Sequence, residues 1–315
     1  MPGIIRTVAG DMDTEQLGWC QCHEHLFLRR GEPYKVSKAL CMEDYDKSLG
    51  ELKEYYRAEG VSIVDAQPVY AGRMASALRK ASQESGVHII ASTGFHKAAF
   101  YESSSPVFSM SQKDLTDLFI AELEEGMKED GRSLPSRAGI IKVAVDRGGC
   151  DATPAYSRLF GAAVAASAET GAAIMAHFEP DTDVFQLIDK MDAAGIPPAR
   201  LIACHLDRAR IDAGYHRQVA CTGAYLEYDT INRLKYVSNE SEIHLIRQML
   251  EYGLEDHLLL SLDTTNERLR TYGSSMGLDY ILTVFRPMLE KNGVLDSTVR
   301  KMMIANPSKA IAVMK

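Results

Sequence analysis

The chain has 315 residues, a length that suits one large α/β barrel, and its 46% hydrophobic and 25% charged residues are ordinary for a globular protein. A net charge of −8 argues against nucleic acid or an anionic membrane surface as a partner. The six cysteines lack metal-knuckle spacing, the N-terminus turns polar early, and no apolar run approaches the roughly 18 residues of a membrane helix. These features favour a soluble protein of the reducing cytoplasm.

Short apolar, β-branched runs alternate along the chain with longer segments of helical periodicity. The expected strands are 17–28, 62–68, 87–95, 139–146, 172–179, 201–207, 223–230 and 257–265. The expected helices lie near 43–59, 72–86, 112–129, 154–170, 183–195, 210–220, 240–253 and 277–292. Eight strands, each followed by a helix, predict a single α/β domain, a (β/α)₈ TIM barrel spanning 1–315. A doubly wound open sheet is the alternative, although no glycine-rich phosphate loop follows the first strand.

Unusual polar residues lie at the carboxyl ends of these strands, where barrel enzymes hold their active sites. The first strand contains His23 and His25, which share one face because side chains alternate along a strand. By the same alternation, Cys20, Cys22 and Glu24 are expected to face the surrounding helices. We therefore interpret the cysteines as packing residues, with a cysteine nucleophile as the alternative.

The later strands add further members of this polar group: Lys142, His177, His205 and Asp263. Imidazole and carboxylate are common ligands of zinc, manganese and nickel. A single histidine at a strand end is more often a hydrogen-bonded core residue, but four histidines with an aspartate at one mouth favour a metal site.

Lys142 lies in the segment AGIIKVAV, which is as apolar as a buried parallel strand. A buried ammonium costs several kcal/mol unless it is neutralised or paired. In one interpretation the lysine stem packs in the core and its amine reaches the barrel mouth. In the other, the amine reacts with CO₂ to form an anionic carbamate, whose two oxygens can bridge two cations.

Nine motifs resemble those of the phosphotriesterase-like branch of the amidohydrolase superfamily, and particularly its bacterial sugar-lactonase members, some of which act on phosphorylated substrates. They run in order through nearly the whole chain: CHEHLF, GVSIVDAQP, VHIIASTGF, AGIIKVAV, TGAAIMAHFE, IACHLD, YDTI, SLDTT and ANPSKAI. The resemblance implies a binuclear metal centre at the carboxyl end of the strands. His23, His25 and Asp263 would hold the more buried ion, and His177 and His205 the more exposed one.

By the same resemblance, Lys142 as N6-carboxylysine would bridge the two divalent ions together with a hydroxide. Zinc is expected, with Mn²⁺, Co²⁺ or Ni²⁺ as alternatives. Asp263 would accept the proton of the attacking hydroxide. Asp65 and Asp207 are candidates to orient the ligand imidazoles, or else are capping and turn residues. A homodimer is expected from the resemblance as well.

The loops that follow the strands are rich in cations, although the protein as a whole is acidic. Cations gathered at one mouth attract an anionic substrate. The expected substrate contacts are Lys97, Arg208, Arg233, Lys235 and Arg268. Together with the resemblance to sugar lactonases, these cations lead us to expect a metal-dependent hydrolase that opens an anionic, phosphorylated sugar lactone.

Two alternatives remain: a phosphotriesterase or other esterase or amidase, such as a deacylase, and a binding protein without turnover. A neutral triester would need apolar walls, for which the candidates are Phe95, Phe100, Tyr101 and Phe108. Asn266 departs from the resemblance, because relatives that recognise the phosphate often carry arginine three residues after the strand-8 aspartate.

Overall fold

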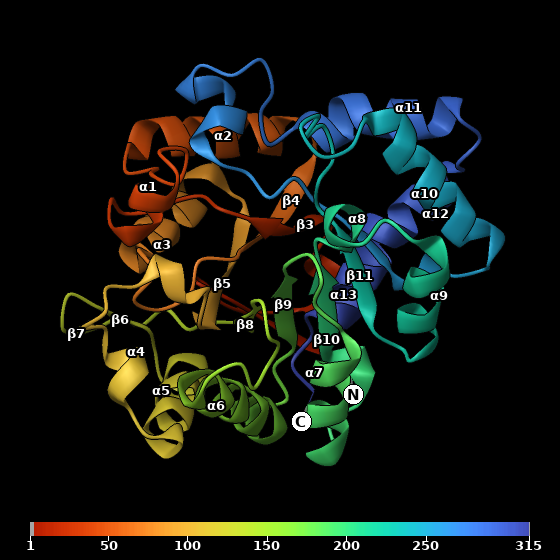
Figure 1. Ribbon diagram of the computed structural model, residues 1–315. Coiled ribbons are helices and arrows are strands. Elements are labelled where there is room, and N and C mark those ends of the chain that lie inside the picture. Colours follow the sequence, from red (N-terminus) through yellow and green to blue (C-terminus); the bar gives the residue numbers. More distant parts are fainter. Residues whose placement is uncertain (1–2, 315) are drawn as a thin grey trace.

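The computed structural model describes residues 3–314, and its centre is an eight-stranded parallel sheet (Figure 1). In spatial order the strands are β3 (Trp19–Glu24), β4 (Gly60–Asp65), β5 (His88–Gly94), β8 (Ile140–Val145), β9 (Ile174–Phe178), β10 (Leu201–Cys204), β11 (Tyr225–Tyr228) and β12 (Leu258–Leu260). Each pairs in parallel with its neighbour, so all eight expected strands are confirmed.

A seam of hydrogen bonds joins the first strand to the last. The Asp263 N–H donates to the His23 carbonyl at 3.0 Å. The Glu24 carboxylate accepts the N–H groups of Leu262 at 2.8 Å and Thr264 at 3.0 Å. The sheet therefore curves back on itself as a (β/α)₈ barrel, and its two end strands meet beside the predicted metal ligands.

Helices cover the outside of the barrel (Figure 1). The long ones are α2 (Tyr45–Arg57), α3 (Ala75–Ser85), α5 (Gln112–Glu124), α6 (Pro154–Thr170), α7 (Phe185–Ala193), α9 (Ala213–Cys221) and α10 (Asn239–Glu251). The short ones are α1 (Glu32–Val36), α4 (Pro106–Ser109), α8 (Leu206–Ala209), α11 (Arg286–Lys291), α12 (Asp296–Arg300) and α13 (Asn306–Ala310). Two π-helical segments, Ile281–Phe285 and Lys301–Ala305, precede α11 and α13.

Two antiparallel hairpins were not expected from the sequence. They consist of β1 (Ile4–Thr7) with β2 (Gly10–Asp13), and of β6 (Lys128–Glu129) with β7 (Arg132–Ser133). The second hairpin explains why the helix expected over 112–129 ends at Glu124, since Gly126 has a φ of +155° and the chain turns there. None of the helices within 3–314 is long and apolar enough to cross a membrane.

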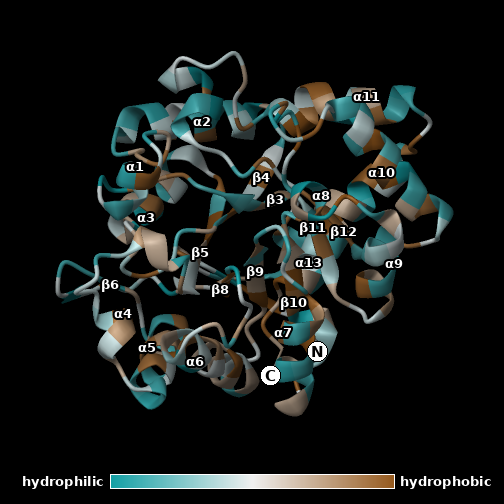
Figure 2. Ribbon diagram, in the orientation of Figure 1, coloured by the Kyte–Doolittle hydropathy of each residue, from teal (hydrophilic) through white to brown (hydrophobic). Residues whose placement is uncertain are grey.

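The hydrophobic core has two layers, one between barrel and helices and one inside the barrel. The helices show both hydrophobic and hydrophilic residues, as expected for elements that are buried on one face (Figure 2). The interior layer contains the inward residues of successive strands, among them Val64, Ile140, Met175 and Leu259. Ile140, Met175 and Leu259 are an even number of residues from Lys142, His177 and Asp263, so they point to the same side of their strands. The interior layer therefore forms the floor beneath the predicted site.

Cys20 and Cys22 belong to this interior layer, so the prediction that they face the helices was wrong. The cause is a bulge in β3: Gln21 pairs with Ile63 and Glu24 with Asp65, so three steps on β3 oppose two on β4. The bulge resets the alternation, and Cys22 and His23 both face into the barrel although they are consecutive.

A prediction concerns Gly94, the last residue of β5. A Cβ at this position would lie 2.0 Å from the Lys142 carbonyl oxygen, and its φ is +94°. We expect Gly94→Ala to destabilise the protein by about 2–4 kcal/mol and to lower its metal content, because β5 and β8 must move apart at Lys142. Urea unfolding and elemental analysis measure the two effects.

Gly253→Ala is the matched control, since Gly253 has a φ of +71° but no atom within 4 Å of the added carbon. Gly253→Ala should lower the free energy of unfolding by about 1 kcal/mol and leave the metal content unchanged. Equal destabilisation of the two variants would contradict a role for the close contact between β5 and β8.

Candidate metal centre

The structure brings all six predicted metal ligands together at the carboxyl end of the barrel. His23 is the second-last residue of β3 and His25 directly follows this strand. Lys142 lies in β8 and His177 in β9, His205 directly follows β10, and Asp263 lies three residues beyond the end of β12. All of them are buried, and Lys142 is 0% exposed. The prediction that these side chains converge on one mouth is confirmed by their contacts.

The donor atoms lie close together. His25 Nε2 is 3.5 Å and His23 Nε2 is 3.8 Å from Asp263 Oδ1. Lys142 Nζ is 3.2 Å from His23 Nε2. The His177 and His205 rings lie 4.3 Å apart between centroids, and the His23 and His205 rings 4.8 Å apart. Two sets of ligands therefore meet at His23.

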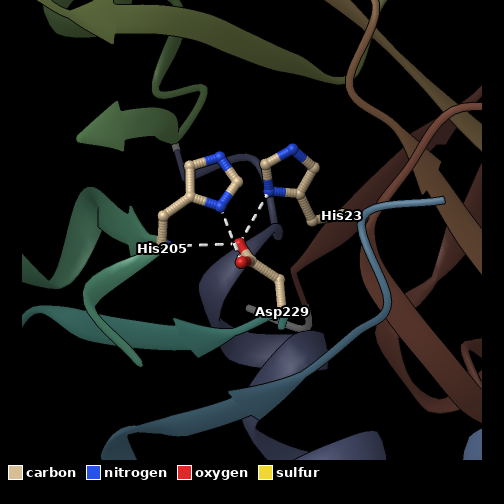
Figure 3. Close-up of side chains that lie close together, drawn as sticks. All are labelled: His23, His205 and Asp229. Carbon is tan, nitrogen blue, oxygen red and sulfur yellow. Dashed lines mark hydrogen bonds and ion pairs between the residues drawn. The ribbon is translucent and has the colours of Figure 1, made fainter. Parts of the chain in front are cut away.

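Asp229, just beyond the end of β11, supports two of these imidazoles and was not predicted. Its Oδ1 lies 2.6 Å from His205 Nδ1, and its Oδ2 lies 3.1 Å from His23 Nδ1 (Figure 3). Both contacts leave the Nε2 atoms of the rings to act as ligands. The sequence did contain a signal, because Asp229 stands in the YDTI motif at the strand-7 position equivalent to the other site residues.

The two aspartates proposed to orient the imidazoles instead accept backbone N–H groups. Asp65 accepts those of Leu26 at 2.9 Å and Gln67 at 3.1 Å. Asp207, in the first turn of α8, accepts the N–H of Thr230 at 2.6 Å. The hydrogen bonds of Asp65 and Asp207 are therefore those of capping and turn residues, as the alternative interpretation expected.

A different carboxylate contacts a third histidine, His177. Glu179 Oε1 lies 2.9 Å from His177 Nε2 and also accepts a bond from Lys97 Nζ. These two contacts lower the pKa of Glu179 well below its usual value, although its partial burial opposes the shift. Glu179 therefore stays ionised and fixes the orientation of the His177 ring.

Burial keeps three of the imidazoles, those of His23, His177 and His205, neutral. It lowers the pKa of His23 to about 4 and that of His177 to about 3, and it lowers the pKa of His205 well below the usual value. Burial also lowers the pKa of Lys142. Neutral imidazole is the form that binds metal ions, so these histidines are ready to act as ligands at neutral pH.

The donor set fits divalent metal ions. One ligand atom from each of His23, His25 and Asp263 lies within 4.8 Å of the other two. His25 Nδ1 is buried and has no hydrogen-bond partner within 3–314. Several neutral imidazoles beside carboxylates, with a buried amine among them, match the ligand chemistry of zinc and related ions.

Two arginines hold Asp263 from the side of the loops. Arg233 Nη1 donates to Asp263 Oδ2 at 2.6 Å and Arg233 Nη2 to the Asp263 carbonyl at 2.8 Å, while Arg208 Nη1 donates to Oδ2 at 3.2 Å. Burial alone would raise the pKa of Asp263, but Arg233, His25 and Arg208 lower it well below its usual value. The carboxylate is therefore ionised and fixed in place.

A cavity of about 530 Å³ opens above these residues. All five predicted substrate contacts line it: Lys97, Arg208, Arg233, Lys235 and Arg268. Arg268 differs from the others, because its terminal nitrogens donate to the carbonyls of Ile231, Asn232 and Leu262. Its guanidinium therefore anchors the loops and contributes to the site mainly through its charge.

The aromatic wall proposed for a neutral substrate is largely absent. Among the four candidates only Phe100 lines the cavity, while Phe95, Tyr101 and Phe108 are not among the lining residues. Asn266 also has a structural role, since its Nδ2 donates to the carbonyls of Lys38 at 3.2 Å and Cys41 at 3.1 Å. It holds the loop after β3.

The structure argues against Cys20 or Cys22 as a nucleophile. Both thiols are 0% exposed inside the barrel, 3.9 Å apart, and burial raises the pKa of Cys22 well above its usual value. A protonated thiol beneath the ligand layer is a packing group.

Comparison with known proteins places this architecture in context. Residues 3–311 match the phosphotriesterase family. A phospho-furanose lactonase of Mycoplasmopsis synoviae is 29% identical over 98% of this chain and 92% of its own length. An N-acetyltaurine hydrolase of Xenopus tropicalis is 27% identical over 98% of both chains. The structure of a lactonase from Listeria monocytogenes superposes with a TM-score of 0.90 at 28% identity, covering 99% of this chain and 100% of that one.

A prediction follows from the two contacts of Asp229. We expect Asp229→Asn to weaken metal binding about 10- to 100-fold, because the carboxylate that orients His23 and His205 is lost. Metal titration of chelator-treated protein measures the effect, and thermal unfolding of the metal-free protein reports on folding.

Asp146→Asn is the control, because Asp146 also follows a barrel strand but its carboxylate contacts Arg147 N–H and Tyr156 Oη rather than an imidazole. It should bind metal like the unchanged protein. If Asp229→Asn bound metal as tightly as the unchanged protein, the imidazoles would not need this carboxylate to bind metal.

Proposed function

The chain belongs to the phosphotriesterase family and is a hydrolase of ester bonds, and we propose that its substrate is an anionic, phosphorylated sugar lactone. The observation that carries the proposal is the gathering of five cationic side chains around one cavity above the metal ligands, in a protein with a net charge of −8. Such a field attracts a small anion to the reacting groups.

The pairing of these cations identifies the best anchor for the anionic group. Arg208 and Arg233 bind Asp263, and Lys97 binds Glu179. Lys235 is exposed, and no carboxylate within 3–314 pairs with it; its ammonium lies only over the Tyr236 ring, 4.8 Å from the centroid. Lys235 is therefore free to bind a phosphate without giving up another partner.

In this proposal two divalent ions, expected to be zinc, are held by His23, His25, Lys142, His177, His205 and Asp263. When bound, such ions polarise a carbonyl and lower the pKa of water towards neutrality. We propose N6-carboxylysine for Lys142, because its amine is fully buried and lies at hydrogen-bond distance, 3.2 Å, from the neutral His23 ring. A carbamate would convert a buried cation into an anionic ligand.

Asp263 is the proposed proton acceptor. Arg208 and Arg233 keep its carboxylate ionised beside the histidines, so it can take the proton of an attacking water. As the ring C–O bond breaks, Asp263 returns this proton to the departing ring oxygen. The product is the open hydroxy acid.

An amidase for a small anionic N-acyl compound is the second candidate. It is supported by the N-acetyltaurine hydrolase, which this chain matches over 98% of both lengths. A sulfonate and a phosphate are both tetrahedral anions, so the same cations could bind either. A phosphotriesterase is less well supported, because three of the four proposed aromatic wall residues are missing from the cavity lining. Homodimer formation and a cytoplasmic location stay predictions from the sequence.

The proposal is tested by a panel of lactones supplied with and without a phosphate, assayed beside an N-acyl taurine and a phosphotriester. We expect the phosphorylated sugar lactones to have the highest kcat/KM. Lys235→Ala should raise KM for them at least about tenfold, because a charge-assisted contact is lost.

Lys113→Ala is the control, since Lys113 pairs with Asp117 on the exposed surface of α5. It should leave all rates unchanged. Equal or better turnover of uncharged lactones would contradict the proposed anionic substrate, and preferred cleavage of the N-acyl taurine would favour the amidase.

A further inference from the structure

Tyr236 stands at the cavity mouth, half exposed, with three cations around its ring. The guanidinium carbons of Arg208 and Arg233 lie 5.0 Å and 6.0 Å from the ring centroid, and Lys235 Nζ lies 4.8 Å from it. The negative face of an aromatic ring attracts cations at such distances. Tyr236 is therefore the shared neighbour of three positive charges that come from two different loops.

The loop after β11 is folded so that this ring is held in position. Arg233 N–H donates to the Thr230 carbonyl at 2.9 Å, and Tyr236 N–H donates to the Arg233 carbonyl at 2.8 Å. These two consecutive turns bring Tyr236 back beside Arg233. Arg208 reaches the same ring from α8, the short helix after β10.

The charges around the ring do not balance. Three cations surround it, and the carboxylate that contacts them is Asp263, which binds Arg208 and Arg233 but not Lys235. A carboxylate or sulfonate would neutralise one of the two remaining positive charges. A phosphate monoester, with a charge between about −1.5 and −2 at pH 7, would neutralise both.

We propose that Tyr236 is a specificity-determining residue: its ring gathers Arg208, Arg233 and Lys235 into one binding site for a tetrahedral dianion, the phosphate monoester of the substrate. This inference rests on the proposed function, to which it adds the location and charge of the anion site. Because Arg233 contacts both the ring and Asp263, the phosphate and the reacting carbonyl must belong to one compact molecule.

Calorimetry with glycerol 3-phosphate tests this site without turnover, since the probe carries the phosphate but no lactone. We expect Tyr236→Leu to raise its Kd about tenfold, because the ring attraction for three cations is lost. Tyr236→Phe keeps the ring and should bind within about twofold of the unchanged protein. Methanesulfonate, a monoanion, should bind the unchanged protein more weakly than glycerol 3-phosphate.

Tyr252→Leu is the matched control. Tyr252 is also partly exposed and lies beneath one guanidinium, that of Arg217 at 5.1 Å, but it does not line the cavity. It should leave the Kd unchanged. Metal content is measured for each variant, so that a weaker Kd at equal metal content reports on the ring rather than on the metal ligands.

Turnover adds a second readout. Tyr236→Leu should lower the ratio of kcat/KM for a phosphorylated lactone to that for its uncharged counterpart, mainly through KM, and Tyr236→Phe should restore the ratio. Unchanged phosphate binding in Tyr236→Leu would overturn the inference, as would an equal loss in Tyr236→Phe, which would assign the effect to the hydroxyl. If no lactone is hydrolysed, the proposed function fails, while the calorimetry still decides the anion site.

Discussion

The site depends on one constraint, the burial of the Lys142 amine among neutral imidazoles. An ammonium that is 0% exposed and lies 3.2 Å from His23 Nε2 is costly, and its burial outweighs the attraction of Asp263, Asp229 and Glu227. Burial lowers the pKa of this amine and of the surrounding histidines. The proposed carbamate with two divalent ions would resolve this conflict, because it would place an anionic ligand and cations where the protein alone has a buried amine.

The rest of the barrel supports that arrangement in layers. Beneath the ligands lies the apolar interior layer that includes Cys22 and Met175, and behind them Asp229 and Glu179 orient three of the imidazoles. Above them the arginines hold Asp263. Asp229 thus fixes His23 and His205 from a different strand end, and Arg208 and Arg233 fix Asp263 from other segments of the barrel mouth, which is how a rigid barrel positions reacting groups.

The sequence predicted the eight strands and the six converging side chains because both depend on local patterns, namely strand alternation and the position of polar residues at strand ends. It failed at Cys20 and Cys22, because a bulge that resets the alternation leaves no local signature. It also missed Asp229 as an orienting group, since a contact between residues 24 or more positions apart cannot be inferred from one segment.

The sequence likewise could not predict which carboxylates or carbonyls the loop cations bind. Arg268 and Lys235 look alike as loop cations, yet one donates to three backbone carbonyls and the other has no carboxylate partner within 3–314. Which cation is free depends on how the loops fold over the barrel mouth. Asn266 illustrates the same point, because it holds a neighbouring loop through two carbonyls instead of facing a substrate.

The most direct test of the central claim is isotope labelling of Lys142. Protein reconstituted with zinc in ¹³C-bicarbonate should show one carbamate carbon per chain by NMR and bind about two zinc ions, and Lys142→Ala should lose the signal and most of the metal. Added short carboxylates should restore part of the metal binding to Lys142→Ala. Full zinc occupancy in the unchanged protein without a carbamate signal would contradict the account.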